Sequence, residues 1–231
     1  IGPAGFVDAT LHDIELSVKK GAPPSYRAVF AKAVRPAVLV GITLAVFQQL
    51  CGINVVFNYT STIFKSVGAN LDNQLFQTVA IGVVNMLFTL VAMWQVDKLG
   101  RRPLMLIGSL GLSVVYIILA SLLKFQAATG LVSVFVLIAI GLYATSLAPV
   151  TWVLIAEIFP NNIRGVASSV AIVSLWIAYF ILVFTFPILA EHLGAYGPFY
   201  MYAVICFLGF LFIKGRVTET KGQTLEQLEQ S

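Results

Sequence analysis

Charged residues are scarce in this sequence: Asp, Glu, Lys and Arg make up 10% of its 231 residues, against about a quarter in soluble domains. Hydrophobic residues make up 59% and the mean hydropathy is +0.93, values that exclude a water-soluble domain and a disordered chain. The 14 Lys and Arg form no basic tract, which excludes a nucleic-acid-binding protein. The two cysteines, Cys51 and Cys206, lie in apolar runs and are too few for a disulfide scaffold. The composition is therefore that of a membrane protein.

Six long stretches contain no Asp, Glu, Lys or Arg: 36–64, 73–96, 103–123, 125–156, 165–190 and 192–213. Each exceeds the length of about 20 apolar residues with which a helix crosses the core of a bilayer. None alternates apolar and polar residues as the strands of a membrane β-barrel do. The sequence thus predicts an all-α membrane protein with six transmembrane helices.

Ionisable side chains are missing from the deep part of these stretches, since His12 and His192 both lie outside it. An intramembrane protease would need a buried base or a pair of carboxylates, and a selective ion channel a ring of charge or a carbonyl filter sequence. We therefore expect a protein that is not an enzyme, uses no metal or cofactor and has no proton relay of its own. On helix count, a self-contained six-helix carrier or neutral-solute pore acting as an oligomer stays open.

Lysine and arginine are distributed unevenly between the connections. Alternate connections carry 12 against 2, and the two are Lys65 and Lys124. Because cytoplasmic loops carry an excess of these residues, we expect both termini in the cytoplasm and Lys65 and Lys124 on the outer side.

The two ends carry patterns of their own. A stripe of apolar residues at helical spacing predicts a short amphipathic helix: Val7, Leu11, Ile14 and Val18. Thr224 and Gln227 have the spacing of a capping box, which predicts a helical turn after Gly222. The chain divides into residues 1–34, a transmembrane bundle at 35–214 and a cytoplasmic tail at 215–231. Because it opens with Ile1 and has no signal peptide, we expect a fragment or a processed product.

Polar side chains and a helix breaker are concentrated in the middle of the first stretch. An intramembrane amide is costly unless it finds a partner, so such residues are candidates for function. On an unbroken helix Asn54 would lie about 120° around the axis from Gln48, and the amides could face one ligand only if the helix unwound near Gly52. Broken helices at membrane depth are typical of transporter binding sites. The polar residues here are Gln48, Gln49, Asn54, Asn58 and Tyr59.

The fourth stretch repeats the pattern with helix breakers and an aromatic residue. Gly141 and Pro149 precede Trp152, so we expect a second break just before the indole. The main amide of the second stretch is Asn85. Carboxamides donate and accept hydrogen bonds at once, and a flat aromatic ring covers the C–H face of a sugar, so the set favours a neutral polyol as ligand. Taken singly, each residue could instead hold helices together or anchor one at the membrane interface.

Four ordered motifs resemble those of the sugar porters of the major facilitator superfamily. Residues 48–54 read QQLCGIN, similar to the family's QQxxGIN in its seventh helix. Residues 97–103 read DKLGRRP, similar to the D-x-x-G-R-R loop between helices eight and nine. Residues 149–165 resemble the PxxW and E-x6-R segment of helix ten, and residues 219–225 resemble the PETKG-x-T-L tail. The motifs extend over nearly the whole chain.

The resemblance implies the C-terminal half of a twelve-helix transporter that moves a hexose or a pentose by alternating access. Residues 1–34 would hold the end of the cytoplasmic linker helix. The partners would be a monosaccharide, a lipid bilayer of the bacterial inner-membrane type and the N-terminal half of the same transporter. Coupling to protons, to sodium or to nothing stays open, because the coupling residue of proton-linked relatives would lie in the other half. The expected sugar-binding residues are Gln48, Gln49, Asn54, Asn58, Asn85 and Trp152.

The sequence departs from the family pattern at several of these positions. Asn58 stands where the family usually has the first of two tyrosines, and Ala148 replaces the glycine before Pro149. Leu175 and Tyr179 occupy positions where members often have amides. Because such changes alter the hydrogen bonds offered to a ligand, the resemblance does not carry the identity of the sugar.

The resemblance also implies an ion-pair network that ties helix ends together on the cytoplasmic side while the cavity opens outward. As solvated loop charges, such pairs would contribute about 0–1 kcal/mol each. A gate needs only a small bias between two packed states, which favours the network. Its expected members are Asp97, Arg101, Arg102, Glu157, Arg164 and Glu219.

Overall fold

The computed structural model describes residues 29–32, 34–160, 163–217 and 219. Of Asp97 it describes the backbone but not the side chain. Within these ranges the chain is helical and has no β-strand. Six segments are long and apolar enough to cross a membrane, namely 35–58, 71–96, 101–124, 129–157, 164–193 and 197–216. The predicted fold class, all-α with six transmembrane helices, is confirmed. The predicted helix in residues 7–18 and the predicted turn after Gly222 lie outside the described residues.

Two of the six spans are broken into shorter helices. The first consists of α2 (Arg35–Leu50) and α3 (Ile53–Asn58), which α4 (Thr60–Ser66) follows. The fourth consists of α7 (Thr129–Thr145) and α8 (Leu147–Glu157). The other four spans are the long helices α5 (Leu71–Leu99), α6 (Arg101–Lys124), α9 (Arg164–Leu193) and α10 (Gly197–Arg216).

Two spans begin four or five residues later than charge spacing predicts. The fourth span begins at Thr129 rather than at residue 125, because the chain turns at Gln126, whose φ is +49°. The sixth begins at Gly197 rather than at residue 192, because α9 continues to Leu193 and the chain turns at Gly194. Both turns lie in stretches without Asp, Glu, Lys or Arg, so charge alone did not reveal them.

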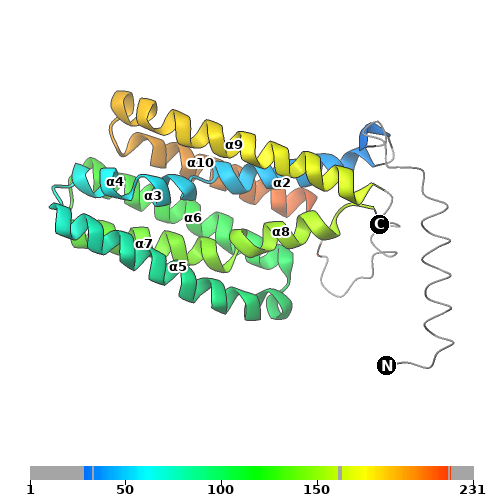
Figure 1. Cartoon of the computed structure of the whole chain (residues 1–231), viewed down its shortest axis with the longest axis horizontal. Helices are drawn as coiled ribbons and strands as arrows, with labels where there is room; N and C mark the ends of the chain where they lie inside the picture. The colour runs from blue at the N-terminus through cyan, green and yellow to red at the C-terminus, as the bar shows by residue number, and fades with distance from the viewer. Residues whose placement is uncertain (1–28, 33, 161–162, 218, 220–231) are drawn as a thin grey trace.

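The helices are arranged as a bundle in which α10 packs along α6, α9 along α2, and α7 against both α5 and α6. Figure 1 looks onto the face bordered by α5 and α9, with the two broken spans between these borders. Over the apolar part of each span, 61% of the first is buried, against 56% of the fourth, 22% of the fifth and 11% of the second. The first span is thus among the most buried of the six, while α5 and α9 expose most of their surface.

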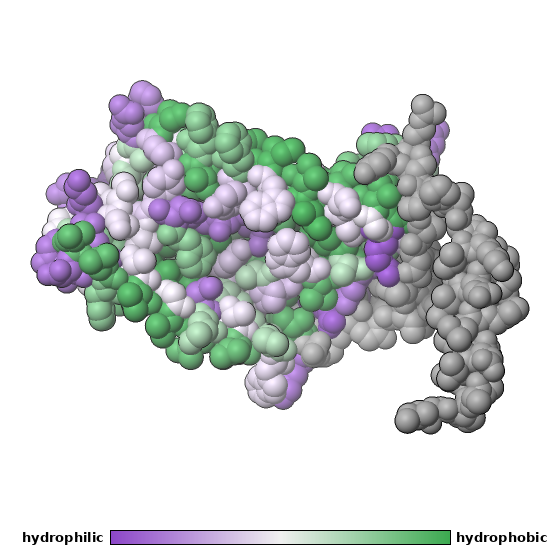
Figure 2. Space-filling view, in the orientation of Figure 1, coloured by the Kyte–Doolittle hydropathy of each residue, from purple (hydrophilic) through white to green (hydrophobic). Residues whose placement is uncertain are grey.

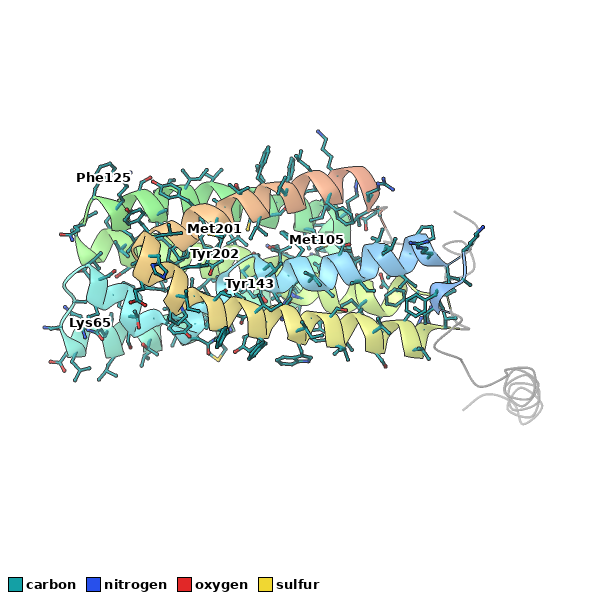
Figure 3. The ribbon with its side chains drawn as sticks, turned by 90° about the horizontal axis from the view of Figure 1, so that it is seen from above. Lys65, Met105, Phe125, Tyr143, Met201 and Tyr202 are labelled. Atoms are coloured by element: carbon teal, nitrogen blue, oxygen red, sulfur yellow. The ribbon has the colours of Figure 1, made fainter. Side chains whose placement is uncertain are left out.

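The cations gather at the two ends of the bundle as the alternation of connections predicts. Arg101 at the start of α6 and Lys214 in the last turn of α10 lie at the end of the bundle from which α2 begins. Lys65 in the last turn of α4 and Lys124 at the end of α6 lie at the opposite end. Figure 3 shows Lys65 and Phe125 together at one end and Tyr143 and Tyr202 midway along the bundle. Which end faces the cytoplasm stays a prediction.

Candidate functional site

The break in the first span is centred on Gly52. This residue has φ +89° and ψ −5°, a left-handed conformation that side chains with a Cβ disfavour. A Cβ at this position would also collide with ring atoms of Tyr202, on α10. Glycine is therefore required both for its backbone angles and for space, and the predicted unwinding near Gly52 is confirmed.

The break brings amides of α2 and α3 into contact. Asn54 Nδ2 donates a hydrogen bond to Gln49 Oε1 across it. Gln48 Nε2 donates to the hydroxyl of Tyr143 on α7, at 2.6 Å. Both glutamines are buried, and among the described residues nothing donates to Gln48 Oε1. This oxygen is therefore a buried, unsatisfied acceptor, which makes it a candidate contact for a ligand.

The short helix α3 is tied to α9. Asn58 Nδ2 donates to the carbonyl oxygen of Asn54 at 2.7 Å and to the hydroxyl of Tyr179 at 3.2 Å. The hydroxyl of Tyr59 donates to the carbonyl oxygen of Val183 at 3.0 Å, and its ring lies 4.7 Å from that of Phe186. The amides Gln49, Asn54 and Asn58 thus form a row from α2 over the break to α9. We refer to these three residues as the amide row.

The second break lies at Ser146, six residues before Trp152, and not just before the indole as expected. Pro149 is the third residue of α8. A proline has no N–H for the carbonyl four residues earlier and its ring collides with that carbonyl, so the helix is interrupted near Thr145 rather than at the proline itself. Trp152 follows on α8 and has 45% of its surface exposed.

Asn85 and Trp152 lie on other helices than the amide row. Asn85 is half-buried on α5, and no hydrogen bond among the described residues joins its side chain to the row. Helix α8, which carries Trp152, packs against both α2 and α5. It therefore lies between the helix that carries Gln49 and the helix that carries Asn85. Figure 2 shows polar and near-neutral side chains along the middle of this face, with hydrophobic ones on both flanks. The expected sugar contacts remain predictions.

Sequence reasoning missed Tyr143, which accepts the hydrogen bond from Gln48. It also assigned no contact to Tyr179, although this residue stood out as a departure from the family pattern. A buried tyrosine in an otherwise apolar span usually finds a partner for its hydroxyl, and this is the signal that would have indicated Tyr143. Its partner, on a helix 95 residues away, follows only from the fold.

At the end of the bundle that holds Arg101 and Lys214, Glu219 caps the start of α6. Its carboxylate accepts hydrogen bonds from the backbone N–H groups of Arg101 and Arg102, at 3.0 and 3.1 Å. The negative charge lies at the positive end of the helix dipole. Gly100 has φ +90°, and a Cβ there would lie 2.7 Å from Glu219 Oε2, so glycine gives the carboxylate access to the backbone.

Two arginines also join α6 to neighbouring elements, and Arg164 joins α9 to the segment after α8. Arg101 Nη2 forms an ion pair with Glu157 Oε1, at the end of α8, at 3.3 Å. Arg102 Nη2 donates to the carbonyl oxygen of Lys214 at 2.8 Å. Arg164 Nε donates to the carbonyl oxygen of Phe159 at 3.1 Å. The side chain of Asp97 lies outside the described part, and the role of the six charged residues as a gate stays a prediction.

Three comparisons place the chain among known proteins. A family model described as "Sugar (and other) transporter" matches residues 6–231. The D-xylose-proton symporter of Escherichia coli is 39% identical over 198 residues, which cover 83% of this chain and 40% of the relative. The glucose transport protein of Synechocystis is 38% identical over 238 residues, covering 97% and 51%. The solved structure of the proton:xylose symporter XylE bound to 6-bromo-6-deoxy-D-glucose matches with a TM-score of 0.77 at 39% identity, covering 84% of this chain and 42% of that one.

These relatives are transporters rather than enzymes, as the sequence led us to expect. The chain spans about half the length of the curated relatives it matches. Its six-helix bundle is accordingly half of a major facilitator fold. The chain belongs to the sugar transporter family of the major facilitator superfamily.

Proposed function

We propose that this chain is the C-terminal half of a transporter that moves a monosaccharide, a hexose or a pentose, across the membrane. The observation that carries the proposal is the break at Gly52, where Asn54 meets Gln49 and Gln48 Oε1 is left as a buried acceptor. Amides that both donate and accept suit the hydroxyl groups of a sugar. The six binding residues are Gln48, Gln49, Asn54, Asn58, Asn85 and Trp152.

The ligand in this proposal is neutral. The six spans carry no Asp, Glu, Lys or Arg at membrane depth, so a bound ion would lack a countercharge. The exposed indole of Trp152 offers an apolar face to the C–H side of a sugar ring. Proton coupling, which the name of the Escherichia coli relative states for that protein, would need an ionisable residue in the other half.

In this proposal, transport requires a second domain that moves against this one. The chain matches about half of its relatives, and α5 and α9 leave most of their surface uncovered along the borders of the polar face. The N-terminal half would cover this face, and rocking of one half against the other would expose the sugar to each side in turn. By the distribution of Lys and Arg, the end that holds Arg101 and Glu157 faces the cytoplasm.

The charged end would act as the cytoplasmic gate. The ion pair between Arg101 and Glu157 links α6 to α8, and Glu219 links α6 to the segment after α10. These contacts hold the helix ends of this half in one arrangement, which the other half can engage when the cytoplasmic side is closed. A bias of a few kcal/mol between two states suffices to shift their populations.

The binding site is tested with Gln49→Leu and Trp152→Ala in the complete transporter. We expect each variant to bind sugar more weakly, by about 1–3 kcal/mol for Gln49→Leu, because a sugar hydroxyl loses its partner in a buried site. The measurement is the dissociation constant for D-xylose and D-glucose by calorimetry. Gln77→Leu, which removes an amide of α5 outside the amide row, is the control. Unchanged affinity for both sugars in both site variants would exclude this site.

Reconstitution tests whether a half is sufficient. Residues 1–231 in liposomes should catalyse no saturable sugar uptake, and co-expression with the N-terminal half should restore it. Sugar-specific uptake by the purified chain alone would favour the self-contained six-helix carrier instead.

A further inference from the structure

Two buried hydroxyl groups have no hydrogen-bond partner among the described residues. They belong to Tyr116 on α6, which is completely buried, and to Tyr202 on α10, which is 3% exposed. Figure 3 shows Tyr202 midway along the bundle. A buried polar group without a partner destabilises the state that contains it, and native structures hold few of them. Each hydroxyl is therefore a donor for which this arrangement of the helices offers no acceptor.

The two tyrosines belong to a closely packed pair of helices. Ser113, one turn before Tyr116 on α6, donates its hydroxyl hydrogen to the carbonyl oxygen of Ala203 on α10 at 2.8 Å. The centroids of the two tyrosine rings are 6.3 Å apart, and the ring of Phe199 lies 5.8 Å from the first and 6.0 Å from the second. Because rings packed in this way have little freedom to turn, an acceptor has to move to the hydroxyls rather than the reverse.

The first break lies against this pair of helices. The ring of Tyr202 occupies the space that a Cβ of Gly52 would need. Two carbonyl oxygens at the break accept thiol hydrogens, that of Gln48 from Cys51 at 2.9 Å and that of Cys51 from Cys206 at 3.7 Å. A thiol is a weaker hydrogen-bond donor than a phenol. Cys206 follows Tyr202 by one turn of α10, so this helix presents one donor in use and one unused donor on the same face.

Alternating access requires a second arrangement of the helices, because one site opens to each side in turn. Glycine absorbs a change of backbone angles more readily than other residues, so Gly52 is the place where the first span can bend differently. Rotation of α3 about this residue would carry the carbonyl groups of the break away from the thiols and along α10. A hydroxyl that lacks a partner in one arrangement and gains one in the other brings the free energies of the two arrangements closer together.

We propose that the hydroxyls of Tyr202 and Tyr116 are the donors for the carbonyl groups of the first break in the second arrangement of the transport cycle. Both are positioning residues, because they act through the backbone of the first span and not on the sugar. The inference rests on the proposed function, since it assumes alternating access, but it is independent of which sugar is carried.

Tyr202→Phe and Tyr116→Phe in the complete transporter test the proposal, because each removes the hydroxyl and keeps the ring. The melting temperature in detergent should not fall, since no hydrogen bond of the present arrangement is lost. The dissociation constants for D-xylose and D-glucose should stay within about twofold, because neither hydroxyl contacts the sugar. The turnover rate of sugar uptake in liposomes should fall about fivefold in each variant, because the second arrangement loses a hydrogen bond.

Tyr200→Phe is the matched control on the same helix. The Tyr200 hydroxyl shares a hydrogen bond with Ser121 Oγ at 3.0 Å, so its removal should lower the melting temperature and leave the turnover rate within about twofold. A turnover rate that is unchanged in both Tyr202→Phe and Tyr116→Phe would overturn the proposal, whether or not the melting temperature falls. That result, obtained with an active unmodified transporter, would leave the proposed function intact. An unmodified transporter that takes up neither sugar would refute the proposed function, and this inference would fail with it.

Discussion

The two broken spans achieve an interruption at membrane depth by different means. In the first, the chain turns at a glycine with a left-handed conformation, and amides lie on both sides of the turn. In the second, it turns at Ser146, ahead of a proline, and the flanking residues are largely apolar. Glycine redirects the backbone and so brings side chains from two helices together, whereas the proline only interrupts a helix that then continues.

Both breaks free carbonyl groups that lipid cannot satisfy, and side chains supply the donors. At the first break, Cys51 Sγ donates to the carbonyl oxygen of Gln48 at 2.9 Å, and Cys206 Sγ to that of Cys51 at 3.7 Å. At the second, the hydroxyls of Ser146 and Thr145 donate to carbonyl oxygens one turn earlier. The first break thus draws one of these two donors from α10, while the second is satisfied within its own span.

Substituting Gly52 should have the largest effect. Gly52→Val adds a Cβ that collides with the Tyr202 ring, and it forces a branched residue into a left-handed conformation. Strain and overpacking together should destabilise the fold by about 3 kcal/mol or more. The measurement is thermal unfolding of the complete transporter in detergent, together with the yield of folded protein.

Gly82→Ala is the control for this substitution, because nothing lies within 4 Å of the added atom. It should change the stability by less than about 0.5 kcal/mol. A Gly52→Val protein as stable as the Gly82→Ala protein would show that the first span does not need its glycine, and the distinction between the two breaks would be lost.

Removing the hydroxyl that joins the two broken spans should have the next largest effect. Tyr143→Phe leaves Gln48 Nε2 without its acceptor in a site where Gln48 is 3% exposed, so we expect a loss of about 1–3 kcal/mol of stability. Tyr116→Phe is the matched control, because its buried hydroxyl has no partner among the described residues and its removal should cost nothing. Equal melting temperatures of the two variants would contradict the importance of this bond.

The sequence predicted the helices and their number because the bilayer demands a fixed length of uncharged chain. It predicted the break at Gly52 because a row of amides can serve one ligand only on an interrupted helix. It misplaced the second break, since the proline acts on a carbonyl one turn earlier than its own position. The partners Tyr143 and Tyr179 come from distant helices, and no local pattern specifies which helices will be neighbours.

The far segments of the two spans are also held differently, α3 by hydrogen bonds to α9 and α8 by an ion pair to α6. Arg101→Ala should destabilise the complete transporter by about 1 kcal/mol or less, because the pair is only partly buried. It should also shift the population toward the inward-open state, which spin-label distances across the cytoplasmic side would report. Arg216→Ala, an exposed cation at the same end, is the control. Unchanged distances in Arg101→Ala would make these ordinary surface charges.

Substituting the proline of the second span should have the smallest effect. Pro149 lies in the first turn of α8, where a backbone N–H has no partner within the helix, so its absence costs little. Pro149→Ala supplies an N–H that can reach the carbonyl oxygen of Thr145, yet the hydroxyl bonds of Ser146 and Thr145 already satisfy the turn before it. We expect a change in stability below about 0.5 kcal/mol and sugar affinity within about twofold. Pro187→Ala, at a proline in the interior of α9, gives the reference for restoring a missing helical hydrogen bond. If Pro149→Ala alters stability as much as Gly52→Val, the second break depends on its proline as strictly as the first depends on its glycine.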